Sequence, residues 1–305
     1  MLAVNEYLPQ ESLNFFNTSV FFKLHATSNS YYFQWLVHER PVLTLNLSET
    51  EEGCYVSPVR GTYGGIDGIT NVRHSESIAF INEVERFLNE RGASKVRVIL
   101  PPSFHDLHGV SLQQFLLESQ GYHSVFCDIN YSAPVDAAAF ETRTCRDSKR
   151  RLKKLRSGGL SVTRGGSEML EKVYGLIEVH HSAKNFRLSM TMEQLALMLN
   201  VYPDNFELFC GELDGVCIAA VIGVHLNDNI FYIFKIADLP GYERFSPSIA
   251  MVQACYDHAY QCGCKFLDYG ISSVAGVPNL GLMNFKRGLG FSETLKVTME
   301  KSLGS

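Results

Sequence analysis

The chain has 305 residues, of which 46% are hydrophobic and 19% are charged, a balance typical of globular proteins and not of disordered ones. Its formal net charge of −5 argues against a general nucleic-acid coat, although a local basic patch could still contact phosphate. The length exceeds what one hydrophobic core usually holds and suits two domains.

The first half alternates strand-like and helix-like segments. Residues 75–92 carry apolar residues at helical spacing between Ser75, a candidate N-cap, and Gly92, which predicts an amphipathic helix. A second helix is expected at residues 110–122. Segments rich in aromatic and β-branched residues are predicted strands, two of them joined as a hairpin, at residues 19–25, 31–40, 41–49, 53–58, 94–102 and 123–132.

The composition changes within residues 132–148, and we place the domain boundary there, with units at residues 1–135 and 136–305. Just after this boundary, residues 149–156 hold six cations in eight positions. Such a run is usually the solvated face of a helix. The alternative is contact with a phosphorylated carrier, such as tRNA or a nucleotide-linked sugar.

The second half repeats the style of the first. Residues 205–238 predict three strands joined by Leu-Asp-Gly and Asn-Asp-Asn turns, and Ser246 and Pro247 mark the expected start of a helix. The other helices and strands of this half are expected at residues 167–183, 191–199, 264–270, 279–290 and 291–300. Two α/β units of similar order suggest a structural duplication.

Most of the eight cysteines lie inside apolar segments and none forms a C-x-x-C pair, which predicts buried free thiols in a reducing compartment. Cys262 and Cys264 are spaced C-x-C, but no second Cys/His pair follows nearby, so no metal is expected. The N-terminus has no basic region followed by an apolar run, and no segment approaches about 18 uninterrupted apolar residues. We therefore expect a cytoplasmic protein without membrane insertion.

Several stretches, in their order and spacing, resemble the Gcn5-related N-acetyltransferase (GNAT) fold, at residues 57–68, 143–162, 180–199, 207–224, 264–272 and 279–291. They look in particular like the double-GNAT proteins of the Fem family, aminoacyl transferases that build peptidoglycan cross-bridges, and their acyl-CoA N-acyltransferase relatives. The resemblance implies an α/β (α+β) fold of two GNAT-like units in tandem, with a cleft between or beside them. Each unit would be a mixed, mostly antiparallel sheet flanked by helices.

One departure concerns the acyl donor. GNAT acetyltransferases carry an Arg/Gln-x-x-Gly-x-Gly/Ala loop that cradles the CoA pyrophosphate, whereas the corresponding residues 246–253 read SPSIAMVQ. The resemblance therefore implies acyl-CoA as one donor and leaves an acyl or aminoacyl ester as another.

Three residues near the C-terminus are candidate catalytic groups. Lys286 falls near the apolar side of its short helix and must snorkel or meet a charge; the resemblance implies that it faces the donor–acceptor cleft and contacts an oxyanion or phosphate. Asp268 could accept a proton from the amine, and Tyr269 could donate one to the leaving group. The alternatives are a turn cap for Asp268 and a packed core aromatic for Tyr269.

Candidate binding residues form three groups. The loop with Tyr63, Gly64 and Gly65 could curl its backbone around a substrate, or it could be a tight connection between strands. Arg187 could fork onto a carboxylate or phosphate, or be a surface charge. Ser246 and Ser248 begin a helix whose free N–H groups could bind an anion, the alternative being an ordinary capped helix.

These features predict an N-acyltransferase that moves an acyl or aminoacyl group from a thioester or ester donor to an amine acceptor, by direct attack in a cleft. The expected partners are a small-molecule amine or nucleotide-linked substrate, and a tRNA or acyl carrier. A tRNA-dependent Fem-type aminoacyl transferase is an alternative, although residues 140–205 are too short for a long helical-hairpin arm. A non-catalytic GNAT-fold binding protein is the third reading.

Overall fold

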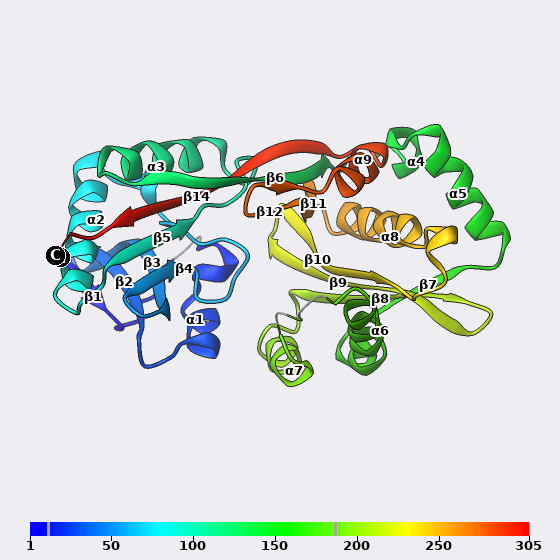
Figure 1. Ribbon diagram of the computed structural model, residues 1–305, viewed down its shortest axis with the longest axis horizontal. Helices are drawn as coiled ribbons and strands as arrows, with labels where there is room; N and C mark the ends of the chain where they lie inside the picture. The colour runs from blue at the N-terminus through cyan, green and yellow to red at the C-terminus, as the bar shows by residue number, and fades with distance from the viewer. Residues whose placement is uncertain (11–12, 186–187, 189, 305) are drawn as a thin grey trace. The chain divides into compact units, whose positions relative to one another are not determined.

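A computed structural model describes residues 1–10, 13–185, 188 and 190–304 and divides the chain into two compact units. Unit 1 comprises Met1–Asn130, Ser273–Pro278 and Thr294–Ser305, and unit 2 comprises Tyr131–Ser272 and Asn279–Glu293. Each unit has a mixed sheet with helices packed on it, as the fold class predicted (Figure 1). Single turns of 3-10 helix lie at Phe15–Asn17, Ile69–Asn71, Ser167–Met169 and Glu243–Phe245.

The sheet of unit 1 has the strand order β1-β2-β3-β4-β5-β14-β6. Its strands are β1 (Leu2–Val4), β2 (Ser30–Val37), β3 (Arg40–Glu51), β4 (Cys54–Ser57), β5 (Lys95–Ile99), β6 (His123–Pro134) and β14 (Ser292–Ser302), and its helices are α1 (Ser19–His25), α2 (His74–Asn89) and α3 (Leu107–Ser119). The β4–β5 pair is parallel, whereas the β1–β2, β2–β3, β3–β4 and β5–β14 pairs are antiparallel. Phe33, Leu43, Phe80, Val96 and Met299 lie in the core between sheet and helices.

Two expectations for unit 1 were wrong. Residues 19–25, predicted as a strand, form α1, because Thr18 caps the helix by accepting the Phe21 N–H at 3.2 Å. Phe21 and Phe22 are both buried, whereas a strand with one solvated face would expose one of two neighbours. Helix α2 begins at His74 behind Arg73, without a side-chain cap, so Ser75 lies in its first turn.

The sheet of unit 2 has the order β6-β11-β10-β9-β8-β7. Its strands are completed by β7 (Ser161–Gly165), β8 (Phe206–Leu213), β9 (Val216–Asn227), β10 (Ile230–Asp238) and β11 (Phe266–Ile271), and its helices are α4 (Phe140–Arg143), α5 (Arg146–Ser157), α6 (Leu170–Ala183), α7 (Met192–Val201), α8 (Ser248–Gln261) and α9 (Leu280–Gly288). Helix α8 covers one face of this sheet and α6 and α7 the other (Figure 1). Coverage of both faces explains why β9 is buried without interruption from Ile218 to Val224.

The two units repeat one order of elements: three strands, a helix, a strand, a helix and a strand. In unit 1 this order runs from β2 to β6, and in unit 2 from β8 to β14. In both, the fourth strand of the series joins the third in parallel, as β4–β5 and β10–β11. The expected structural duplication is thus visible in the connectivity, although the residues of the two halves have diverged.

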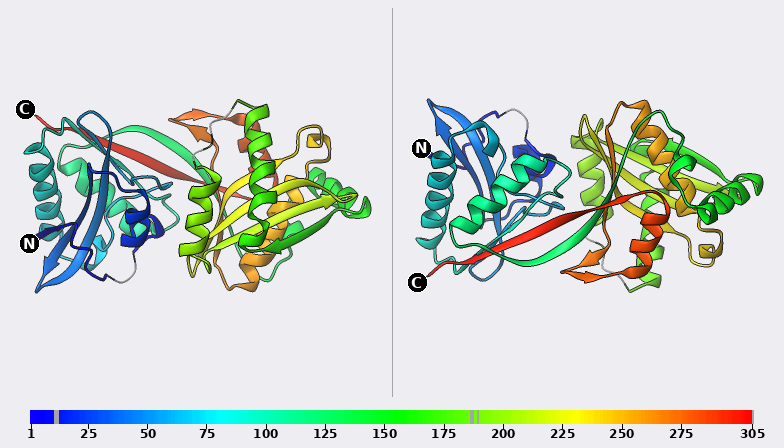
Figure 2. Two further views of the ribbon diagram at one scale, coloured as in Figure 1. Left: turned by 90° about the horizontal axis from the view of Figure 1, so that it is seen from below. Right: turned by 90° about the horizontal axis from the view of Figure 1, so that it is seen from above.

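The last strand of each series continues into the other unit. Strand β6 passes into unit 2 after Asn130, and β14 passes into unit 1 at Thr294, where Thr298–Ser302 pairs with β5 (Figure 2). A short hairpin of β12 (Ser273–Val274) and β13 (Val277–Pro278) also belongs to unit 1. The predicted division into residues 1–135 and 136–305 therefore differs from the compact units, since no single cut of the chain separates them.

Two further observations bear on the sequence expectations. Cys210 and Cys217 form a disulfide within the β8–β9 hairpin, so the expectation of free thiols was wrong for this pair. The six other cysteines are free. Within the described part of the chain, no helix has the length and apolar character needed to cross a membrane.

Candidate functional site

The parallel strands β10 and β11 diverge in unit 2. They pair only through Ile230–Tyr232 and Phe266–Asp268, at the beginning of both strands. Beyond Tyr232, β10 continues to Asp238 along β9, with a register irregularity between Ile233 and Lys235. Among the residues that the structure describes, the backbone groups of β10 on the β11 side pair with no strand beyond Tyr232, which leaves donors and acceptors for another chain or ligand.

Lys286 of α9 lies at the diverging end of β11. Its side chain is only 2% exposed, and Nζ donates to the carbonyl oxygens of Tyr269, Gly270 and Ile271 at 2.7, 2.9 and 2.9 Å. The ammonium also lies 4.5 Å from the centroid of the Tyr269 ring. The three N–H groups of the ammonium thus each donate to one carbonyl oxygen. The cation is enclosed by the backbone of β11, and its hydrogen bonds hold that backbone in place.

Lys286 was expected to snorkel or to meet a charge; its ammonium is instead buried against backbone carbonyls, and its position facing a cleft stays a prediction. The apolar residues of this helix are not its buried side, since Leu280 is 65% exposed and Met283 is only partly buried. Lys286 is the buried residue of α9. Arg287 is exposed and pairs with Glu293, as expected of a solvated charge.

Burial lowers the pKa of Lys286 to about 7, and the nearby negative charge of Asp268 opposes this shift. The unfolded chain keeps the lysine proton up to about pH 10.5, whereas the folded chain releases it near pH 7. Between these values the unfolded state binds more protons, so the free energy of unfolding rises with pH. Below pH 7 both states are protonated, and the group adds no pH dependence.

We therefore expect the stability difference between the wild type and Lys286→Met to move in favour of the wild type as pH rises from 7 towards 10.5. The slope should be at most about 1.4 kcal/mol per pH unit. Urea unfolding of both proteins at several pH values measures this difference, and other titrating groups cancel in it. A difference that is constant across the window would contradict the lowered pKa.

Asp268 and Tyr269 lie within β11, and both are enclosed. The Asp268 side chain is 2% exposed, and its Oδ1 accepts the Gly270 N–H at 2.8 Å. Gly270 has φ 70°, so this bond stabilises a left-handed turn, as in the alternative reading of Asp268 as a turn cap. Tyr269 packs against Phe291 with ring centroids 5.3 Å apart, and burial raises its pKa far above the ordinary value. A tyrosine in this state is a weak proton donor, so its role as an acid stays a prediction.

The N-terminus of α8 already holds an anion from the protein itself. The helix begins at Ser248, one residue later than predicted. Ser246 lies before it with φ 54° and does not cap it. Ser248 Oγ donates to Asp238 Oδ1 at 2.6 Å, and the Asp238 carboxylate also accepts a backbone hydrogen bond from Ser248. Burial raises the pKa of Asp238, while the bonds from Ser248 oppose the shift. The side chain thus occupies the position where the sequence placed a ligand anion.

Residues near this helix start come from other elements of unit 2. Arg151 of α5 donates to Ser246 Oγ at 2.7 Å. His180 of α6 places Nδ1 2.8 Å from the carbonyl oxygen of Asp238, which ties the end of β10 to the helix layer. Sequence reasoning missed Asp238, because the residue ends a strand and nothing in the local sequence shows that its carboxylate contacts a helix that begins ten residues later.

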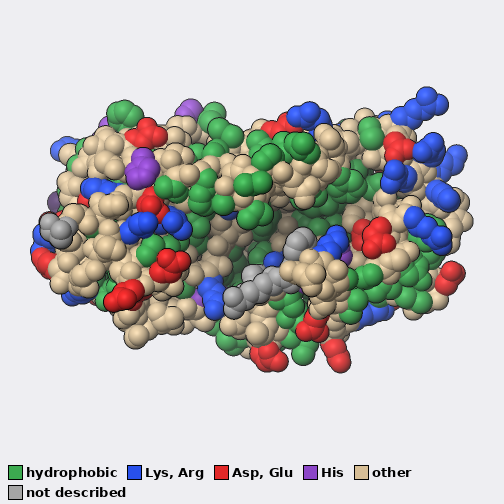
Figure 3. Space-filling view, in the orientation of Figure 1, with side chains coloured by type: hydrophobic (Ala, Val, Ile, Leu, Met, Phe, Trp, Pro, Cys, Tyr) green, Lys and Arg blue, Asp and Glu red, His purple; other side chains and the backbone are tan. Residues whose placement is uncertain are grey.

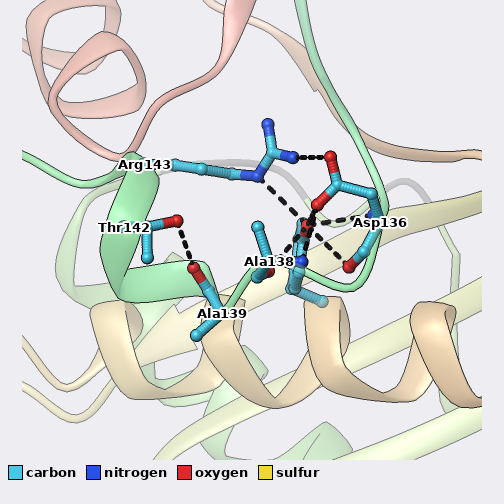
Figure 4. Close-up of polar contacts among 6 residues, drawn as sticks. Asp136, Ala138, Ala139, Thr142 and Arg143 are labelled. Atoms are coloured by element: carbon cyan, nitrogen blue, oxygen red, sulfur yellow. Dashed lines mark hydrogen bonds and ion pairs between the residues drawn. The ribbon is translucent and has the colours of Figure 1, made fainter.

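The predicted basic run does form a helix. Lys and Arg side chains gather over α5 (Figure 3). Arg150 and Arg151 pair with Asp147, and Arg156 pairs with Glu141. The segment before α5 is fixed by Arg143, whose guanidinium bonds Asp136 and donates to the Tyr256 hydroxyl at 3.1 Å (Figure 4). The run is therefore a partly ion-paired helix face held against α8.

The loop with Tyr63, Gly64 and Gly65 lies within unit 1. Tyr63 is 3% exposed and packs its ring 5.0 Å from that of Phe16. Gly64 donates its N–H to the Ile99 carbonyl at 2.8 Å, and a Cβ on Gly65 would approach Gln113 Oε1 to 2.3 Å. These contacts account for the glycines through packing, so substrate binding by this loop stays a prediction. Arg187 lies outside the described residues.

An apolar pocket lies beside the diverging strands on the α6–α7 face. Its cavity volume is about 10 Å³, and its walls include Tyr174, Leu195, Ile222, Phe234 and Lys235. Burial lowers the pKa of Lys235 below its ordinary value. Sequence reasoning missed this pocket, since its residues come from two helices and two strands that only the fold brings together.

A family model described as an acetyltransferase (GNAT) domain matches residues 142–287. This stretch contains the diverging strands, the α8 N-terminus and Lys286. Residues 142–287 are therefore similar to a GNAT acetyltransferase domain. The match agrees with the GNAT fold that the resemblance implied. Comparison with curated protein sequences gave no match.

Solved structures share the whole fold at low identity. FemX superposes with a TM-score of 0.70 at 11% identity, over 95% of this chain and 94% of that protein. The C-terminal domain of a putative lysylphosphatidylglycerol synthetase from Agrobacterium fabrum has a TM-score of 0.61 at 9% identity, over 91% and 85%. A tandem GNAT protein from the clavulanic acid biosynthesis pathway has a TM-score of 0.55 at 10% identity, over 92% and 85%. At these identities the similarity concerns the fold alone.

Proposed function

We propose that unit 2 transfers a short acyl or aminoacyl group to an amine at the diverging ends of β10 and β11. The observation that carries this proposal is the parting of two parallel strands beside the enclosed ammonium of Lys286. An extended donor can add to the open edge of β10 through its amide groups. Its carbonyl would then lie near the Lys286 ammonium, which keeps its charge below about pH 7, in a setting with little water.

The reaction needs no covalent enzyme intermediate. The amine nitrogen attacks the donor carbonyl carbon, the resulting oxyanion collapses, and the carbon–sulfur or carbon–oxygen bond to the leaving group breaks. The proton lost by the amine ends on the leaving group, so the step is balanced. Lys286 acts electrostatically, because its charge favours negative charge developing beside β11 while its N–H groups hold the three carbonyls. Direct contact with the oxyanion requires the exchange of one carbonyl bond.

The pocket on the α6–α7 face supports a small acyl or side-chain group. Its cavity volume is only about 10 Å³, so a large group could not enter without movement of the walls. The walls are mostly apolar, and Lys235 offers one polar atom. A series of donors with increasing acyl length should therefore show a fall in kcat/KM beyond short chains.

An aminoacyl ester carried by tRNA is the second candidate donor, and Asp238 favours it. The Asp238 carboxylate occupies the α8 N-terminus, which is where a helix would otherwise bind the phosphates of a nucleotide donor. A tRNA carries phosphates along its whole backbone, so its binding does not depend on the N-terminus of α8. Helix α5 offers exposed cations for such phosphates, at Lys149, Lys153 and Lys154. The structural similarity to a putative lysylphosphatidylglycerol synthetase domain is in keeping with aminoacyl transfer.

One experiment tests both donors. The purified protein is incubated with acyl-CoAs or with charged tRNAs, each with a panel of small and nucleotide-linked amines, and the acylated amine is detected by mass spectrometry. Turnover of acyl-CoA supports the thioester donor, and turnover of charged tRNA alone, falling steeply with salt, supports the ester donor. Binding without turnover under both conditions would leave a non-catalytic protein and overturn the proposal.

Asp238→Asn tests whether donor phosphates approach α8. Asparagine keeps a hydrogen-bonding oxygen for Ser248 but removes a negative charge from the helix start. If phosphates dock nearby, affinity for CoA should rise about two- to fivefold, equivalent to roughly 0.3–1 kcal/mol. Calorimetric titration measures this change, with Asp136→Asn as the matched control on a half-exposed carboxylate. If Asp238→Asn and Asp136→Asn bind CoA with the same affinity, the donor phosphates do not dock near the start of α8.

A further inference from the structure

Three potential metal ligands converge in unit 2 away from the residues used above. His225 comes from β9, His258 from α8 and Cys262 from the residue that follows α8. One ligand atom from each lies within 4.8 Å of the other two. His225 Nε2 is 3.0 Å from His258 Nε2, and Cys262 Sγ is 3.6 Å from the same His258 atom.

These separations are close to the edges of a zinc tetrahedron. Zinc binds imidazole nitrogen at about 2.0–2.1 Å and thiolate sulfur at about 2.3 Å. Tetrahedral angles then place two nitrogens roughly 3.3 Å apart and a nitrogen and a sulfur roughly 3.6 Å apart. The three side chains therefore need only a small adjustment to share one ion.

A carboxylate lies beside these three side chains and would have to move closer to take the fourth position. Glu207 of β8 lies on the same sheet face as His225, because Phe206 pairs with Val224 and the next residues of both strands point to the opposite side. Its Oε1 is 3.7 Å from His258 Nε2. Two imidazoles, a thiolate and a carboxylate form a donor set that suits zinc among the divalent metals.

Arg164 of β7 competes for the same histidine. Its Nη1 lies 2.6 Å from His258 Nδ1, and it lies 3.6 Å from Glu207. His258 cannot accept from arginine at Nδ1 and bind a metal at Nε2 while remaining a neutral ligand. Metal binding therefore requires Arg164 to release Nδ1, which its side chain can do because it is 49% exposed.

We propose that His225, His258, Cys262 and Glu207 form a binding site for a divalent transition metal, with zinc as the best fit. The ion would join the C-terminal end of α8 to β8 and β9, and so fasten the helix to the sheet at the end opposite Ser248. The C-x-C spacing of Cys262 and Cys264 did not reveal this site, since both histidines come from other elements. Cys264 instead lies with Sγ 3.7 Å from His225 Nδ1, where it can orient the ring.

The test uses the full chain, stripped of metal with a chelator and titrated with zinc against a chromophoric competitor. We expect one zinc per chain, and with cobalt a thiolate-to-metal charge-transfer band together with the strong visible bands of a four-coordinate ion. Cys262→Ser should abolish the charge-transfer band and weaken zinc binding by at least about tenfold. Arg164→Gln should strengthen zinc binding, because it removes a competing cation.

Cys145→Ser is the matched control, since Cys145 is also an exposed free cysteine. It should bind zinc as the wild type does, and circular dichroism establishes that each variant is folded. His225→Gln separates the proposed site from adventitious binding to the Cys262–Cys264 thiols, because it should weaken zinc as Cys262→Ser does. The proposal fails if wild type shows no saturable binding, or if His225→Gln or Cys262→Ser binds zinc as tightly as Cys145→Ser.

Discussion

Lys286→Met is expected to lower the rate of acyl transfer by at least about 100-fold, the size of effect seen when one group that stabilises a developing oxyanion is removed. Methionine has a similar length and apolar character, so it can fill the buried space while removing the charge. It also removes the donors for the carbonyls of Tyr269, Gly270 and Ile271. Unsatisfied buried acceptors cost about 1–3 kcal/mol each, so a loss of stability should accompany the loss of rate.

The measurement is kcat and KM with whichever donor and amine support turnover, at a temperature where circular dichroism shows a folded variant. An electrostatic role predicts a fall in kcat with KM little changed. Arg287→Gln is the matched control, because Arg287 is the next residue of α9 but is exposed and paired with Glu293. It should retain wild-type activity within about twofold. A folded Lys286→Met protein with more than half of the wild-type kcat would remove Lys286 from the mechanism.

Local turn chemistry explains why most strands could be predicted. The Leu213–Val216 connection uses Asp214 and Gly215, both with positive φ, and the β8–β9 hairpin follows as the sequence indicates. The prediction of a strand at residues 19–25 failed for the opposite reason. Their aromatic residues suggested a strand, while the Thr18 cap and the packing of two adjacent phenylalanines decided for a helix.

The candidate site was predictable only in part. Lys286 was found because a lysine near an apolar helix side needs a partner, but its partners proved to be backbone carbonyls, which carry no sequence signal. The same holds for Asp238, whose contact with Ser248 depends on where β10 ends relative to α8. His225 and His258 are 33 residues apart, and their contact follows from the packing of α8 on β9.

The course of β14 leads to the second large prediction. Chain order assigns this strand to unit 2, yet its residues from Thr294 onward belong to unit 1, where Met299 pairs with Val98 and is 0% exposed. Met299→Ala should therefore destabilise unit 1 by about 2–5 kcal/mol through lost burial and a residual cavity. The single tryptophan, Trp35, lies on β2, so its fluorescence during urea unfolding reports on unit 1.

Leu295→Ala provides the control for this prediction, because Leu295 is on the same strand but is 54% exposed. Its effect should stay within about 0.5 kcal/mol. The comparison tests topology as well as packing, since a strand that served only unit 2 would leave the Trp35 transition unchanged in both variants. If Met299→Ala shifts that transition and Leu295→Ala does not, the last residues of the chain complete the core of its first unit. The sheet of unit 1 then needs residues from both ends of the chain. This explains why no single division of the sequence separates the two units, although their elements follow the same order.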